Sequence, residues 1–120
     1  MGAFTPQAVV TSAARTTSGQ SSAITPGGVA PSSQSDTIAL AVDVTAASGT
    51  TPSMTVSVEW SFDGTSFFVA DTADAFTAIT TTKKVVKLFD VKAPQYRVVW
   101  TITGTTPSFT FAVTELADKD

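Results

Sequence analysis

The chain is rich in hydroxyl side chains but contains neither histidine nor cysteine, and this limits the chemistry open to it. A Ser-His-Asp triad is excluded, and so is an imidazole metal site, because both need histidine. Without cysteine there is neither a disulfide nor a thiolate metal site. A serine–lysine dyad stays formally open, although no motif places a serine beside any of the candidate lysines, which are Lys83, Lys84, Lys87 and Lys92. We expect no nucleophilic catalysis and no enzymatic activity.

Glu59 and Glu115 are the carboxylates that could work as a pair in glycoside hydrolysis, which needs two acids across a cleft. Glu59 has the opposite phase to Trp60 and is expected to point outward. Glu115 continues the alternate positions of Phe111 and Val113, whose side chains we expect to point inward. We therefore expect Glu115 at the rim of the domain, where the inward face of its strand reaches solvent. Both are therefore interpreted as solubilising residues.

Asp71 and Asp74, with Asp90, could collect a hard cation such as calcium, which prefers oxygen ligands. The spacing of an EF-hand is absent, and solvation is the usual fate of such aspartates. We expect neither a metal nor any other cofactor.

Nucleic-acid binding is also not expected, because it depends on clustered basic residues. The net charge is −3, and the four basic residues from Lys83 to Lys92 lie on one short strand without an aromatic ladder. Gly27-Gly28 lacks the lysine and the helix that follow a phosphate-binding loop.

One pentapeptide, Gly-Thr-Thr-Pro-Ser, occurs twice, at residues 49–53 and 104–108. An alternating apolar run precedes and follows each copy, and strict alternation predicts a strand with one buried face. Glycine and proline in a short polar link are typical of a chain reversal. We therefore expect each copy to be the tip of a β-hairpin. The runs before and after the first copy are Ile38, Leu40, Val42, Val44 and Ala46, then Met54, Val56, Val58, Trp60 and Phe62.

Trp60, Tyr96 and Trp100 could form a sugar-stacking platform if they were exposed, but they share the phase of the apolar runs. This phase favours core packing. Arg97 has the opposite phase to Trp100, and we expect it to pair with Glu59 or with an aspartate across a sheet.

The other strands are shorter. Asp63-Gly64 predicts a tight hairpin turn. The run from Phe67 to Val69 after it could be buried on both faces. With turn signals every ten or so residues and no helical stripe, the chain is predicted to be all-β, an antiparallel β-sandwich or jelly roll of about seven to nine strands. The predicted strands are 37–47, 53–62, 66–70, 76–80, 85–90, 95–103 and 108–116, with less regular ones before residue 36.

We expect residues 1–35 to form an extended N-terminal arm and irregular loop region, and residues 36–120 to form the β-sandwich domain. Residues 7–15 are a candidate edge strand, and residues 23–25 a candidate short strand. The irregular remainder is either an arm that reaches a neighbouring subunit or a solvated loop. Neither a secretory signal nor a membrane span is recognisable, so we expect a soluble protein made in the cytoplasm. The candidate partner contacts are Phe4, Pro6, Val9 and Val10 in the arm and Thr50, Thr51, Thr105 and Thr106 in the repeated turns.

The surface is weakly charged and rich in threonine. The chain holds 22 Thr and 13 Ser, while only 14% of its residues are charged. Threonine fits a pleated sheet, and a weakly charged surface suits dense packing against neighbours because burying a charge is costly. The same composition also fits an ordinary soluble β-protein.

Three segments resemble small Thr-rich structural proteins of tailed bacteriophages, of the head decoration, minor capsid or tail type. These segments are Val58 to Phe67, Ala93 to Trp100 and Gly104 to Phe111, and the resemblance extends over residues 37–115. It implies a non-enzymatic virion protein that binds the major capsid protein on the outside of the shell, commonly as a trimer. It brings no enzymatic residues, and no cofactor, nucleic-acid partner or membrane is expected for the reasons given above. A carbohydrate-binding module or adhesin, and a tail structural protein, are the alternatives.

Overall fold

The computed structural model describes residues 6–26 and 35–119, and this part of the chain is all-β, as the sequence predicts. Six antiparallel strands form one sheet. Within the described residues there is no helix, and hence none long and apolar enough to cross a membrane. The strands are β1 (Gln7–Arg15), β2 (Gly19–Gln20), β3 (Ser35–Ser61), β4 (Phe67–Ala75), β5 (Lys83–Asp90) and β6 (Gln95–Lys119).

The prediction that each pentapeptide forms a hairpin tip is wrong. Strands β3 and β6 each run continuously through their copy of the repeat, and they pair with each other instead of folding back on themselves. The first half of β3 pairs with the second half of β6, as in Val44 opposite Phe111, and the second half of β3 pairs with the first half of β6, as in Val56 opposite Trp100. Two very long strands thus replace four predicted ones. The strand predicted at residues 76–80 is also wrong, because Ile79 makes only an isolated bridge with Met54. The short β2 was not predicted and pairs with β6.

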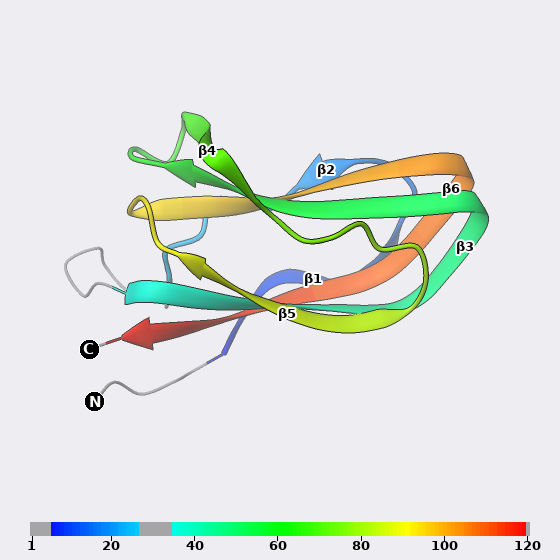
Figure 1. Cartoon of the computed structure of the whole chain (residues 1–120), viewed down its shortest axis with the longest axis horizontal. Coiled ribbons are helices and arrows are strands. Elements are labelled where there is room, and N and C mark those ends of the chain that lie inside the picture. Colours follow the sequence, from blue (N-terminus) through cyan, green and yellow to red (C-terminus); the bar gives the residue numbers. More distant parts are fainter. Residues whose placement is uncertain (1–5, 27–34, 120) are drawn as a thin grey trace.

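The repeated segments are corners rather than tips. Gly49 and Gly104 have φ angles of 114° and 123°, and Thr51 and Thr106 have φ angles of 49° and 46°. Positive φ turns a strand sharply out of its path. Both ribbons change direction at the same end of the molecule, on the right in Figure 1. The ladder continues across the bend with shifts of register.

Because both long strands bend together, the two halves of the sheet lie one above the other (Figure 1). Their inward side chains meet between the halves, as in the edge-to-face contact of Trp100 with Phe111, whose ring centroids are 5.5 Å apart. Trp60 and Tyr96 are buried there too, which confirms the predicted core phase of all three aromatic residues. The rest of the core is aliphatic or Phe, including Ile38, Leu40, Val42, Val44, Met54, Val56, Val58, Val98, Phe109 and Val113.

The predicted edge strand at residues 7–15 is confirmed as β1, which pairs with the second half of β6. The serine-rich segment after it runs beside the first half of β6. There Ser18 Oγ accepts a hydrogen bond from Ile102 N at 2.9 Å, and Ser21 Oγ accepts one from Val98 N at 2.9 Å. Ile24 adds a single β-bridge in place of the short strand predicted at residues 23–25. At this edge of the sheet, serine hydroxyls thus accept hydrogen bonds from backbone N–H groups of β6 that would otherwise be left to solvent.

Some burial predictions were wrong where the strands depart from regular pleating. Phe62 is 67% exposed, whereas Ser61 is buried because its Oγ accepts a hydrogen bond from Gly64 N at 2.7 Å. The turn thus begins at Ser61, one residue before the Phe62-Asp63-Gly64-Thr65 turn that the sequence predicts, and Phe62 is exposed. Ala46 is exposed because the register shifts between Val44 and Ala46.

Two further burial predictions are corrected. Phe68 and Val69 are exposed, although the run to which they belong could have been buried on both faces. Glu115 is fully buried rather than placed at a rim. The predicted turn at Asp63-Gly64 does connect paired strands, β3 and β4, and Gly64 has a φ of 84°.

Candidate functional site

The four threonines of the repeated corners gather at one exposed place. Thr50 and Thr105 are direct cross-strand partners, and Thr51 and Thr106 follow them in the bends. Thr51 donates its hydroxyl hydrogen to Thr50 O at 2.8 Å, and Thr106 donates to Thr105 O at 2.8 Å. All four side chains are exposed and uncharged, so a partner would have no charge to desolvate there. This set of four residues is called the threonine corner below.

The structure does not bring the N-terminal candidates to the threonine corner. Phe4 lies outside the described residues. Pro6 is exposed, Val9 is half-buried, and Val10 belongs to the core with an exposed fraction of 5%. Pro6 precedes the start of β1, which pairs near the end of β6 and so lies at the far end of the sheet from the corner.

Side chains at both ends hold β1 in the sheet. Gln7 Nε2 donates to Glu115 Oε2 at 3.0 Å. At the other end, the Arg15 guanidinium lies 5.0 Å from the ring centre of Trp100 and 4.9 Å from that of Phe111. A cation over aromatic faces is favourable, so β1 is an integral strand of the sheet.

Glu59 and Glu115, the two candidate catalytic acids, serve separate polar contacts. Glu59 Oε1 pairs with Arg97 NH2 at 2.7 Å, which confirms the predicted pairing of Arg97 with Glu59. Glu115 Oε1 accepts a hydrogen bond from Tyr96 OH at 2.6 Å inside the core. Burial, together with the nearby Glu115 carboxylate, raises the pKa of Tyr96 above its ordinary value.

The buried contact joins the two halves of the folded sheet. Tyr96 belongs to the first half of β6 and Glu115 to the second half, so their hydrogen bond closes the space between the layers. A buried carboxylate needs donors of this kind to offset its lost hydration. We interpret the contact as structural.

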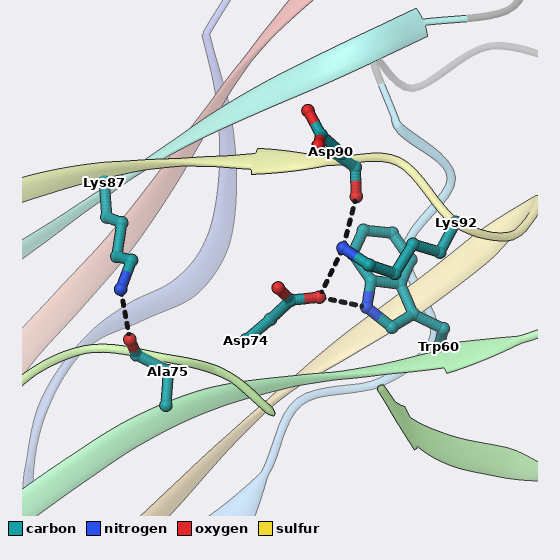
Figure 2. Close-up of polar contacts among 6 residues, drawn as sticks. All are labelled: Trp60, Asp74, Ala75, Lys87, Asp90 and Lys92. Atoms are coloured by element: carbon teal, nitrogen blue, oxygen red, sulfur yellow. Dashed lines mark hydrogen bonds and ion pairs between the residues drawn. The ribbon is translucent and has the colours of Figure 1, made fainter. Parts of the chain in front are cut away.

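Figure 2 shows a second polar cluster, around Asp74. Asp74 Oδ2 accepts a hydrogen bond from Trp60 Nε1 at 2.8 Å and pairs with Lys92 Nζ at 2.8 Å. Lys92 also donates to Asp90 O at 3.1 Å and lies over the Trp60 ring. Asp71, Asp74 and Asp90 were the candidate cation ligands. Two donors already bind the carboxylate of Asp74.

Three of the candidate lysines, Lys84, Lys87 and Lys92, bind carboxylate or carbonyl oxygens. Lys84 pairs with Asp43 at 2.9 Å, and Lys87 Nζ donates to Ala75 O at 2.7 Å (Figure 2). Across residues 6–26 and 35–119, no group of three or more Asp or Glu side chains is placed to hold a metal ion.

No known protein family matches this chain, and no curated protein resembles it significantly. The phage-protein resemblance consequently stands on the three quoted segments alone, and the surface of the molecule becomes the main guide to function.

Sequence reasoning missed the first exposed apolar patch, at the end of the β3–β4 hairpin. Phe62 and Phe68 lie edge to face with ring centroids 5.9 Å apart, and they are 67% and 55% exposed. We call these two residues the phenylalanine patch. Val69 is also exposed, but it follows Phe68 directly in β4 and so belongs to the other face of the strand. The run of apolar residues from Phe67 to Val69 is the available signal, but such a run is equally compatible with a strand buried on both faces.

The second apolar patch lies on the outer face of β5. Val86 and Leu88 are 62% and 68% exposed, and their cross-strand partners on β3 are Ala41 and Ala39. We call these four residues the β5 patch. A strand at residues 85–90 places Val86 and Leu88 on one face, but nothing in the sequence identifies that face as the outer one.

Proposed function

We propose that the protein is a non-enzymatic virion structural protein of a tailed bacteriophage that binds the outside of the capsid lattice and stabilises it. The observation that carries the proposal is the pair of exposed apolar patches on so small a chain. Contiguous exposed apolar surface on a small domain is typical of protein–protein contact sites. The phage-protein resemblance supplies the class of partner.

The rest of the molecule fits such a role. We assign the folded-over sheet to the β-sandwich architecture, a rigid support for surface contacts. The threonine corner adds an uncharged contact surface at one end, and the β3–β4 hairpin, whose residues form the phenylalanine patch, closes toward the other end (Figure 1). Binding at many symmetric positions multiplies weak individual contacts through avidity.

The proposed partner is the major capsid protein, and the protein acts on the capsid surface after its synthesis in the host cytoplasm. The resemblance implies a homo-oligomer, with a trimer favoured. The proposal includes no cofactor, no membrane and no nucleic-acid partner, in keeping with the net charge of −3.

Shell stability tests the proposal. Undecorated shells that contain a dye are heated with and without the purified protein. Shell opening is detected when the dye becomes exposed to solvent. We expect the opening temperature to rise with protein concentration and then to level off. An unchanged opening temperature at every concentration would contradict capsid stabilisation.

Carbohydrate binding is the second candidate, and it now depends on the phenylalanine patch, since Trp60, Tyr96 and Trp100 are buried. The two exposed rings are inclined at 62°, so they offer no single flat platform for a sugar. A glycan array decides between the candidates, because a lattice-binding protein gives no saturable glycan signal. Immunolabelled virus particles distinguish a head position from a tail position.

A further inference from the structure

Strand β5 is an edge strand with an unusual outer face. Among the described residues it pairs only with β3, so its other edge presents unpaired backbone groups. Natural proteins commonly protect such edges, because an open edge invites pairing with another chain. The outward residues of β5 are Lys84, Val86, Leu88 and Asp90, all exposed.

We propose that β5 pairs with β5 of a second copy of this chain, antiparallel, with Lys87 opposite Lys87 of the second copy. In this register Val86 lies opposite the second copy's Leu88, and Lys84 lies opposite the second copy's Asp90. The twofold axis repeats each pair. The outer face then carries an apolar centre flanked on both sides by opposite charges.

Other symmetric registers that keep the same faces together are less favourable. Centring the pair on Val86 places Lys84 opposite the second copy's Leu88. Centring it on Leu88 places Lys84 opposite the second copy's Lys92, and like charges directly opposite each other are destabilising. Only the register centred on Lys87 matches both the apolar and the charged positions, so the strand is complementary to itself in one alignment.

The Lys87 pair at the axis is the unfavourable element of this register. Each Lys87 ammonium is held by its own Ala75 carbonyl at 2.7 Å and lies 5.8 Å from the Phe89 ring centre. These contacts draw the charge toward the link after β4 (Figure 2). Replacing Lys87 with methionine removes the repulsion, so the Lys87→Met variant is expected to associate more tightly than the wild type.

The contact closes on two copies, because the same surface is used on both sides. It can therefore join two monomers or two larger assemblies, and it is separate from any threefold contact. One strand pair buries much less than the roughly 1,600 Å² of a standard interface. We therefore expect association that depends on protein concentration.

Cysteine cross-linking tests the register in the purified full chain, which has no native cysteine. Directly opposite residues of an antiparallel pair have Cα atoms roughly 4.5–5.5 Å apart, within disulfide range. Lys87→Cys should cross-link to itself under mild oxidation. A mixture of the Val86→Cys and Leu88→Cys proteins should give a mixed dimer. Each variant alone should cross-link poorly, because the two identical cysteines of such a dimer would be diagonal neighbours roughly 7–8 Å apart.

Absence of the Lys87→Cys dimer, or equal cross-linking by Val86→Cys alone, would overturn the proposed register. Charge exchange gives a second test that needs no cysteine. Asp90→Lys should weaken self-association about tenfold, because two attractive cross-strand pairs become repulsive.

Lys84 also pairs with Asp43 of its own chain at 2.9 Å, so the rescue exchanges all three charges. Adding Lys84→Asp and Asp43→Lys to Asp90→Lys should restore association, since both pairs that residue 84 makes are rebuilt with their signs exchanged. Asp71→Lys, an equal charge change on an exposed residue of β4, is the matched control. Association is measured by sedimentation velocity over a range of concentrations. Equal weakening by Asp90→Lys and Asp71→Lys, or no recovery in the triple variant, would contradict the pairing. No shells are present, so failure here is distinct from failure of capsid binding.

Discussion

Thr50 and Thr105 are direct cross-strand partners, and they occupy the same place in the two copies of the pentapeptide. The pairing around them has a local twofold relationship. Ser48, just before the first copy, lies opposite Ser108 at the end of the second, and Thr103, just before the second copy, lies opposite Ser53 at the end of the first. Each corner packs into the other. The repeat thus recurs because two long strands must bend together at one place, whether or not it arose by duplication.

The first prediction concerns the corner glycines. In Gly49→Ala the new Cβ would lie 2.8 Å from Pro107 Cα and from Thr106 O, at a φ of 114°. Such backbone strain costs roughly 1–3 kcal/mol, so the free energy of unfolding in urea should fall by about that amount. Gly64→Ala is the comparison, because Gly64 also has positive φ but its Cβ would meet only the movable end of the Gln95 side chain, so Gly49→Ala should lose more. Equal losses in the two variants would contradict the corner packing.

The second prediction concerns a substitution that should not lower stability. Thr51 and Thr106 have positive φ, which costs a residue with a Cβ about 1–2 kcal/mol. Thr51→Gly removes this strain, although glycine adds about 0.5–1 kcal/mol of chain entropy to the unfolded state. We expect an unchanged or higher melting temperature by calorimetry. A clear decrease would mean that the Thr51 side chain stabilises the corner in some further way.

The third prediction concerns alkaline pH. The pKa of Tyr96 is raised in the folded state by burial and by Glu115, whereas an unfolded tyrosine titrates near its ordinary value of about 10. The unfolded state therefore loses a proton that the folded state keeps. Stability is complete below pH 10 and falls above it, by up to about 1.4 kcal/mol per pH unit from this one group.

Tyr96→Phe is the matched variant for that pH dependence. It should lose the tyrosine part of the alkaline slope, and it should also be less stable at neutral pH by about 1.5–3 kcal/mol, because Glu115 loses a donor. Tyr96 is the chain's only tyrosine, so tyrosinate absorbance reports it directly. Tyrosinate that forms well before unfolding would show that Tyr96 is accessible in the native state.

The fourth prediction concerns acid. Backbone N–H groups of Ser66 and Thr65 donate to Asp63 and lower its pKa to about 2. Its contribution to stability is therefore present above about pH 4 and is lost as the pH falls toward 2. Asp63→Asn should flatten this part of the pH–stability curve, as followed by denaturant titration at each pH. An unchanged acid limb would contradict the role of Asp63 in the turn.

Alternation in the sequence was enough to predict strands and most core residues, because the face to which a strand residue belongs follows from its nearest neighbours in the sequence. It gave Trp60, Tyr96 and Trp100 correctly. It could not show which strands pair. Gly49 and Pro52 fit a hairpin tip and a bend equally well, and only contact with the other copy distinguishes them. The role of Ser61 was hidden for a similar reason, because its hydroxyl acts through a turn that begins one residue early.

The candidate contact surfaces were less predictable than the core. The exposed threonines follow from their type and place, but Val86 and Leu88 look like core residues in the sequence. Their exposure depends on which face of β5 meets the other half of the sheet, and Phe89 decides this by packing against Phe76. Such long-range packing leaves no local signal.

Binding of the purified protein to undecorated shells tests the central claim most directly. Co-sedimentation is measured for the wild type, for Phe68→Ser, for Leu88→Ser and for Thr50→Lys with Thr105→Lys, with Thr77→Ser as the control at an exposed position. We predict saturable binding by the wild type and the control, at a fixed number of copies per shell, and weaker binding by at least one surface variant that remains folded. Binding that never saturates, or no binding at all, would contradict the account.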